Sequence, residues 1–135
     1  MGRKTMRTAG ILAAVLWAGI AQAQDVPVET GVNGGSAVSL YLHPFLTPEE
    51  VSTLRVVASN EQALSLFVSS RSGHAALAVS PEDGFVRSGA PVPSAVALGD
   101  LPDAAAARMA ALAECDKLRK GAAPCVVVLE VAPSS

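Results

Sequence analysis

Two cysteines near the end of the chain, Cys115 and Cys125, separate an alanine-rich segment from an apolar one. Alanine recurs at helical spacing between residues 104 and 118, which predicts a helix that can lie close against a sheet because its side chains are small. The run CVVVLEV, which ends at Val131, predicts a strand that is buried on both faces up to Glu130. A disulfide between the cysteines would tie this helix to this strand, and would stabilise the fold by about 2.8 kcal/mol in the chain-entropy model.

The first residues of the chain indicate where such a bond would form. Residues 1–23 have the layout of a secretory signal peptide, with a basic start, the apolar run from Ala9 to Ile20, and the small-residue cleavage motif Ala21-Gln22-Ala23. The apolar run is too short to cross a bilayer, which takes about 20 residues. We therefore predict a periplasmic or secreted protein. A structural disulfide is expected there, and a redox pair is disfavoured because the spacing is not C-x-x-C.

Removal of the signal peptide makes the chain more acidic. Residues 1–23 hold three of the ten basic side chains and none of the twelve acidic ones, so the net charge falls from −2 to −5. The remaining sequence has no basic cluster, which argues against nucleic acid and against anionic membrane surfaces as partners.

The rest of the chain is predicted to hold one domain. Residues 24–36 are glycine-rich and polar without a sustained period, which predicts a flexible lead-in. Residues 37–132 carry the patterned segments and form a domain of common size, and residues 133–135 are expected to be a tail.

The first predicted elements of the domain are a strand and a helix. Residues 37–42 alternate in polarity, as a strand does. Thr47 then suits an N-cap, Pro48 the first helical position and Glu50 the third position of a capping box. The helix is expected to run to about Ser59. Its predicted inward face consists of Val51, Leu54 and Ala58.

The middle of the chain is patterned less sharply. Residues 61–70 alternate in a way that favours a strand, although Asn60 could equally cap a second helical turn. Residues 74–80 alternate better and predict a strand, and a short strand is expected at 85–86. Residues 88–99, which include prolines and glycines, predict an irregular crossover.

The second helix is expected to begin at Asp100, which suits an N-cap. The predicted order is then strand, helix, strand, strand, helix, strand. This order predicts an α+β fold in which two helices pack on a small antiparallel or mixed sheet, with one disulfide, and it permits a ferredoxin-like arrangement.

Four side chains could in principle share a metal ion. These are the two histidines, His43 and His74, with Glu82 and Asp83. Their spacing matches no zinc motif such as H-x-x-x-H, and a metal site usually needs three protein ligands. The two acidic residues are better explained by a turn that begins at Ser80. We therefore assign no metal ligand and no cofactor.

Catalytic motifs are also absent from the sequence. No G-x-S-x-G elbow frames a serine, and no glycine-rich loop has the spacing that binds phosphate. A site that forms only in three dimensions, from residues such as His74, Ser80 or Arg108, stays an alternative. Arg108 is more simply explained as an arginine at the edge of the apolar stripe. We assign no catalytic residue.

Three segments carry a resemblance. GHAALAVSPEDGF, ALAEC and APCVVVLEVAP, which begin at residues 73, 111 and 123, resemble a group of small exported bacterial proteins. The resemblance implies a fold and a Cys115–Cys125 disulfide, and it carries no active site. Some members bear the name 5-aminolevulinate synthase. That enzyme needs a Schiff-base lysine in a large α/β fold, whereas Lys117 and Lys120 lie where the predicted helix ends, a place that favours positive charge.

These observations lead to two hypotheses about function. The first is an exported, non-enzymatic domain with a structural or protein-interaction role, whose partner would be an envelope protein. The alternative is a small hydrolase or ligand-binding domain whose site is not visible in the sequence. The sequence predicts no oligomeric state.

Overall fold

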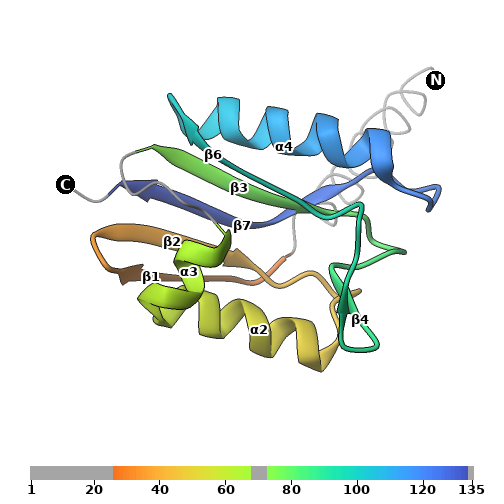
Figure 1. Cartoon of the computed structure of the whole chain (residues 1–135), viewed down its shortest axis with the longest axis horizontal. Helices are drawn as coiled ribbons and strands as arrows, with labels where there is room; N and C mark the ends of the chain where they lie inside the picture. Colours follow the sequence, from red (N-terminus) through yellow and green to blue (C-terminus); the bar gives the residue numbers. More distant parts are fainter. Residues whose placement is uncertain (1–25, 68–72, 134–135) are drawn as a thin grey trace, which may run out of the picture.

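The structure is a computed structural model that describes residues 26–67 and 73–133. The predicted signal peptide, residues 1–23, and the last two residues of the predicted tail lie outside this part of the chain. The described residues form an antiparallel sheet of five strands in the order β1-β2-β7-β3-β6 (Figure 1). The strands of this sheet are β1 Val28–Asn33, β2 Ser36–Tyr41, β3 His74–Val79, β6 Val96–Leu101 and β7 Val126–Pro133.

Helices cover both faces of the sheet. Helices α2, Pro48–Ser59, and α3, Glu61–Phe67, pack on one face, and α4, Ala104–Leu118, packs on the other. Alternate residues of β3 show the division, because Leu77 belongs to the core under α2 while Ala78 belongs to the core under α4. Figure 1 shows α2 beside β1 and β2, and α4 beside β3 and β6.

The predicted fold class is confirmed, since the chain is α+β with an antiparallel sheet and one disulfide. The arrangement of helices and strands is not ferredoxin-like. A ferredoxin-like fold keeps its helices on one face of the sheet, whereas α2 and α4 lie on opposite faces here. The helix layers are also offset sideways: α4 packs on β3, β6 and β7, and no helix of the described residues covers the β1–β2 side of that face.

The predicted flexible lead-in, 24–36, is wrong over most of its length. β1 pairs with β2 along its whole length, from Val28 opposite Tyr41 to Asn33 opposite Ser36. The strands are joined by Gly34 and Gly35, whose φ angles are +58° and +85°. Two central residues with positive φ form the type I′ turn, whose twist matches that of a hairpin. The glycines therefore make a tight turn.

The strand that we favoured at 61–70 is also wrong where the structure describes it. Residues 61–67 are the helix α3, and residues 68–70 lie outside the described part of the chain. The Asn60 side chain accepts a hydrogen bond from the N–H of Ala63 at 3.0 Å, as a helix N-cap does. Leu64 is buried while Leu66 is 87 % exposed. The alternating apolar residues therefore do not share one buried face, as they would in a strand.

The predicted crossover at 88–99 contains the strand β5, Ala90–Pro91, and the first part of the strand β6. A two-stranded hairpin, β4 Val86–Arg87 and β5, is followed by β6 at the edge of the sheet. Because β6 runs to Leu101, the second helix begins later than predicted. Its N-cap is Asp103, whose carboxylate accepts the N–H of Ala106 at 2.8 Å, and Asp100 instead takes a φ of +64° in β6.

The predicted start of α2 is confirmed. Thr47 and Glu50 form both hydrogen bonds of the capping box, and Pro48 is the first residue of the helix. The predicted inward face was partly wrong, because Leu54, Val57 and the Glu50 carboxylate are the buried groups. Val51 and Ala58 lie at the side of the core.

The alanine stripe of α4 packs on β3 as predicted. Ala107 and Ala111 are buried against Ala76 and Ala78, in a core made of small side chains and of the disulfide. Leu118, the last residue of the helix, is 52 % exposed. None of the helices in residues 26–67 and 73–133 is both long and apolar enough to cross a membrane.

Candidate functional site

The three side chains of the alternative catalytic hypothesis lie in different places. His74 begins β3 and Ser80 directly follows its end, so about 20 Å of strand separates them. Ser80 is completely buried, and its hydroxyl accepts the N–H of Asp83. Arg108 lies on α4, where it forms an ion pair with Glu130. The fold therefore does not bring His74 and Ser80 together.

The possible metal ligands are also dispersed. Across residues 26–67 and 73–133, no three His, Cys, Asp or Glu side chains gather as they would around a metal ion. Glu82 and Asp83 each bind a backbone N–H instead. Asp83 accepts the N–H of Lys120 at 2.9 Å, and also the side-chain hydroxyl of Ser94 at 3.0 Å. Glu82 accepts the N–H of Ala123 at 2.9 Å. The hydrogen bond from Lys120, more than any other contact, lowers the pKa of Asp83.

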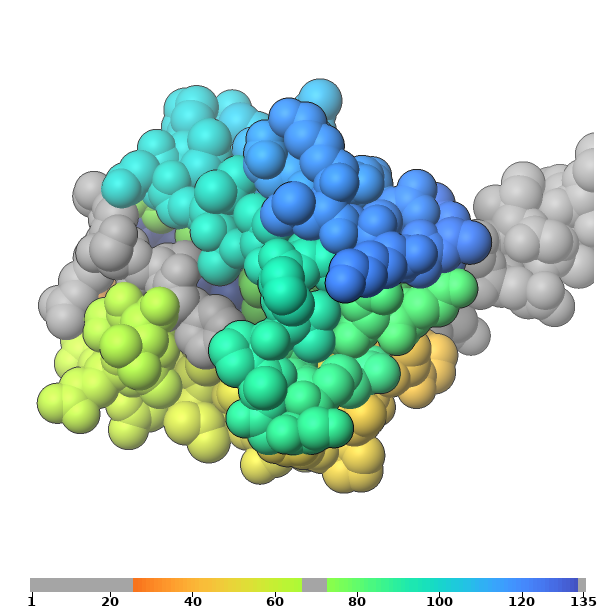
Figure 2. Space-filling model, turned by 45° about the vertical axis from the view of Figure 1, so that its right-hand side comes forward, coloured from red at the N-terminus to blue at the C-terminus, as the bar shows by residue number. Residues whose placement is uncertain are grey.

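These contacts attach the segment 80–95 to the loop that follows α4. Figure 2 shows this segment in green between the blue end of α4 and the yellow start of α2. Its other attachment is to Glu50 on α2, a contact that the sequence analysis missed. The segment therefore connects the two helix layers around one end of the sheet.

Glu50 is completely buried and has hydrogen-bond donors on every side. Its carboxylate accepts the N–H groups of Phe85 at 2.7 Å, Val86 at 3.0 Å and Thr47 at 3.0 Å, and the Nε of Arg87 at 3.2 Å. Burial acts to raise the pKa of Glu50, but these hydrogen bonds together outweigh it and hold the pKa below its ordinary value. A carboxylate surrounded in this way holds α2 and the 80–95 segment together, which is a structural role.

The Cys115–Cys125 disulfide is confirmed, with a Cα–Cα distance of 6.2 Å. It joins the last turn of α4 to the residue before β7. Asp116 supports the same junction, because its carboxylate accepts the N–H of Cys125 at 2.9 Å. That hydrogen bond is the main cause of the lowered pKa of Asp116, and Arg119 adds to it.

The best candidate for a functional site is a cleft beside α4. It lies where α4 stops short of β1 and β2, so the floor is sheet and one wall is helix. Its volume is about 530 Å³. The apolar part of the lining comes from Val26, Val28, Leu112, Cys125, Val126 and Val127.

The polar lining of the cleft is a connected network. Tyr41 Oη donates to one oxygen of Glu130 at 3.0 Å, and Arg108 Nη1 donates to the other at 2.9 Å. Glu130 is mostly buried and sits between β2 and α4. Burial, together with the hydrogen bond to Glu130, raises the pKa of Tyr41. The Glu130 carboxylate raises the pKa of Arg108. At neutral pH Tyr41 is therefore a neutral phenol and Arg108 a charged guanidinium.

His43 closes one end of the cleft. Its Nε2 donates to the carbonyl of Val127 at 3.1 Å, and its ring stacks on Phe45 with the ring centres 5.5 Å apart. The ring is thus fixed in place against the start of β7. His43 was considered in the sequence analysis only as a metal ligand. Tyr41 and Glu130 were read only as strand residues, and no sequence signal shows that they meet across 89 positions.

The arrangement favours binding over chemical transformation. The phenol and the guanidinium both donate to the Glu130 carboxylate, and the apolar lining offers a place for an apolar group. Tyr41 Oη donates its hydrogen to Glu130 and keeps its capacity to accept a hydrogen bond.

The sequence matches no protein-family model, and no significant match was found among curated proteins or solved structures. The resemblance to small exported bacterial proteins therefore stays a prediction.

Proposed function

We propose that the protein is an exported, non-enzymatic binding domain that holds part of a partner protein in the cleft beside α4. The observation that carries this proposal is the half of the sheet face that α4 leaves uncovered. On that face Val28 is 49 % exposed and lies next to Tyr41, its direct neighbour on β2. An exposed apolar strip with a few fixed polar groups is typical of a recognition surface.

The chemistry of the lining suggests what the cleft would hold. An apolar side chain of the partner would pack against Val28 and Leu112. A donor group of the partner, such as a backbone N–H, would bond to Tyr41 Oη. The disulfide supports the proposal, because Cys125 itself lines the cleft and fixes the wall to the floor. A bond of this kind persists in the oxidising compartment that the signal peptide predicts.

Photocross-linking tests the proposal on two positions of one helix. A photoreactive amino acid replaces Leu112, which lines the cleft, or Met109, which is 70 % exposed on the same helix outside the cleft lining. Irradiated cells of the source organism should give a discrete protein adduct from position 112 and none from position 109. The absence of an adduct at 112, or equal adducts at both positions, would overturn the proposal. Retention of the chain in the cytoplasm would overturn the export part.

A second candidate, a domain that binds a small molecule, is favoured by the size of the cleft. Pockets for small ligands commonly measure about 300 to 1,000 Å³, and the volume of the cleft falls in this range. The same cross-linking experiment distinguishes the two candidates. A partner protein adds the mass of a polypeptide to the chain, whereas a small ligand adds a few hundred daltons or less, and both are read from the intact mass of the adduct.

A further inference from the structure

The two edges of the sheet are protected to different degrees. At the β6 edge, α4 packs against the strand, the pairing of β6 with β3 shifts register near His74, and Asp100 has a φ of +64°. Coverage and irregularity of this kind keep an edge strand from pairing with another chain. β1, at the other edge, pairs with β2 in unbroken register and contains neither proline nor lysine. In the described part of the chain, β2 is its only strand partner.

Three residues of β1 direct their backbone groups away from β2. The N–H of Leu42 bonds to the carbonyl of Pro27, which marks that pair as hydrogen-bonded. Hydrogen-bonded pairs alternate in an antiparallel ladder. The next such pairs are therefore those of Glu29, Gly31 and Asn33. It follows that Val28, Thr30 and Val32 present their N–H and C=O groups to the free edge.

The side chains of the same three residues are symmetric about Thr30. Val28 and Val32 lie two positions before and after it, on the face that α4 leaves open, and they are 49 % and 73 % exposed. In an antiparallel pair of identical strands, a residue opposes the one at the mirrored position. When Thr30 lies opposite Thr30 of the second strand, Val28 lies opposite Val32 and Val32 opposite Val28. No other register places all three outward residues of one strand opposite the three of the other.

We propose that β1 joins two copies of this chain, paired antiparallel with Thr30 at the two-fold axis. The pairing satisfies every outward N–H and C=O of Val28, Thr30 and Val32. It places valine against valine on both sides of a threonine pair, which are favourable cross-strand neighbours. The five-stranded sheet becomes continuous across two molecules. The proposal is independent of what the cleft binds, although Val32 of the second copy would extend the apolar floor next to Val28.

The other face of β1 also accepts this register. Glu29 forms an ion pair with Arg55 of α2, with 2.8 Å between the charged groups. In the proposed pairing Glu29 lies opposite Gly31 of the second copy, where even an added Cβ atom would meet no heavy atom of its own chain within 4 Å. The ion pair therefore has room. The two Glu29 carboxylates are not directly opposite each other, and each is paired with its own arginine, so like charges do not meet.

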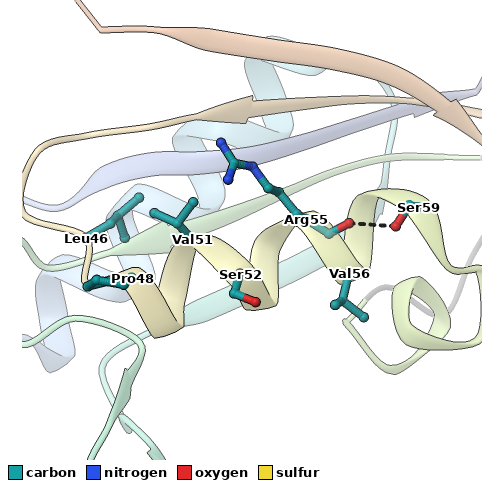
Figure 3. Close-up of a pocket in the computed structure, with 7 residues that line it drawn as sticks. All are labelled: Leu46, Pro48, Val51, Ser52, Arg55, Val56 and Ser59. Carbon is teal, nitrogen blue, oxygen red and sulfur yellow. Dashed lines mark hydrogen bonds between the residues drawn. The ribbon is translucent and has the colours of Figure 1, made fainter.

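The helices of the two copies would come to contact distance. α2 lies over β1 and β2, and strands are about 4.8 Å apart, so two copies of α2 would lie about 10 Å apart, a normal packing distance for helices. A shallow hollow of about 590 Å³ runs along α2. Figure 3 shows the Arg55 side chain extending from α2 toward the sheet, whereas Ser52 and Val56 point away from the sheet. The small Ser52 and Ser59 in this hollow leave space for the second helix.

Sedimentation of the purified protein over a range of concentrations tests the proposal. The chain should form a dimer, and Val32→Lys should raise the dissociation constant of the dimer about 10-fold or more, because the substitution removes two valine pairs and adds a charge at each. Met109→Lys, a change at another exposed apolar side chain, should leave the constant unchanged. A wild-type chain that stays monomeric at all concentrations would overturn the proposal.

Cysteine cross-linking tests the register itself. Directly opposed residues of a hydrogen-bonded pair lie about 5.5 Å apart, within the range of a disulfide. Under mild oxidation Thr30→Cys should cross-link to itself, whereas Val28→Cys and Val32→Cys should cross-link only when the two variants are mixed. Self-cross-linking of either valine variant without that of Thr30→Cys would overturn the register. A strand of a different protein bound at β1, with the chain itself monomeric, would overturn the second copy as the occupant.

Discussion

The carboxylate of Glu50 lies 3.2 Å from the Nε of Arg87, and the Glu50 side chain is completely buried. This pair joins the first turn of α2 to the hairpin β4–β5, 37 positions along the chain. A buried charge is tolerated only when its hydrogen bonds are satisfied, and loss of one partner leaves the other exposed to the full cost of burial. The attachment of the 80–95 segment to α2 therefore depends on the ionised state of Glu50.

Glu50→Gln should destabilise the protein by about 2–3 kcal/mol at neutral pH. The pKa of Glu50 is lowered in the folded state from an ordinary value of 4.5. Its contribution is therefore fully present above pH 4.5 and is lost as the pH falls through the folded pKa. Urea unfolding at several pH values should show a wild-type-to-variant difference that is largest at neutral pH and shrinks in acid.

Glu49→Gln is the matched control for this prediction. Glu49 lies in the same first turn of α2 but is exposed, so its loss should cost only a few tenths of a kcal/mol. A difference between Glu50→Gln and wild type that stays constant from neutral pH to well below pH 4.5 would contradict the role of the ionised carboxylate.

The parts of the fold that the sequence predicted depend on neighbouring residues. The capping box at Thr47, the strand predicted at 74–80 and the Cys115–Cys125 bond each follow from a local pattern. The structure confirms all three, with the strand ending at Val79. The disulfide is an instructive case. Its two cysteines flank a short turn, so proximity in sequence already implies proximity in space.

The parts of the fold that were not predicted depend on contacts between residues far apart in the chain, or on turns whose glycine and proline content resembles that of a linker. Glycine content suggested a linker at 24–36, whereas Asn33-Gly34-Gly35-Ser36 is a two-residue hairpin turn. The prolines of 88–99 likewise concealed β6. Of the polar groups in the cleft, the sequence analysis named Arg108 as a candidate and considered His43 only as a metal ligand. Its partner Glu130 becomes recognisable only when β7 and α4 are placed side by side.

Reduction of the disulfide should lower the free energy of unfolding by about 2–3 kcal/mol, because the cross-linked positions are ten residues apart. The measurement is urea unfolding with and without reductant. A variant that carries both Cys115→Ala and Cys125→Ala should show no response to reductant. A thiol assay on the native protein should detect no free thiol, and a full two thiols per chain would contradict the bond.

The close packing of α4 on β3 predicts strong sensitivity to side-chain size. Ala111 is completely buried against the alanines of β3. Ala111→Leu should therefore destabilise the protein by about 1–3 kcal/mol through overpacking. Ala113, two residues further along the same helix, is exposed. Ala113→Leu should change the stability by less than about 0.5 kcal/mol. Equal effects of the two substitutions on thermal unfolding would contradict the packing of α4.

The network in the cleft can be followed through Tyr41, because it is the single tyrosine of the chain. Burial raises the pKa of Tyr41 above 10.0, the hydrogen bond and charge of Glu130 raise it further, and the charge of Arg108 lowers it. Glu130→Gln should therefore shift the pKa of Tyr41 down toward 10.0, and Arg108→Gln should shift it up. The ultraviolet absorbance of the phenolate, followed in a pH titration, gives both values directly.

The opposite signs of these two shifts make the prediction specific to the network. A general loosening of the cleft would expose Tyr41 in both variants and lower its pKa in both, since burial is the largest cause of the raised value. Glu114→Gln removes an acidic charge from the exposed side of α4, the helix that carries Arg108, and should leave the titration of Tyr41 unchanged. A downward shift in Arg108→Gln would show that Arg108 holds the cleft closed and does not act on Tyr41 through its charge.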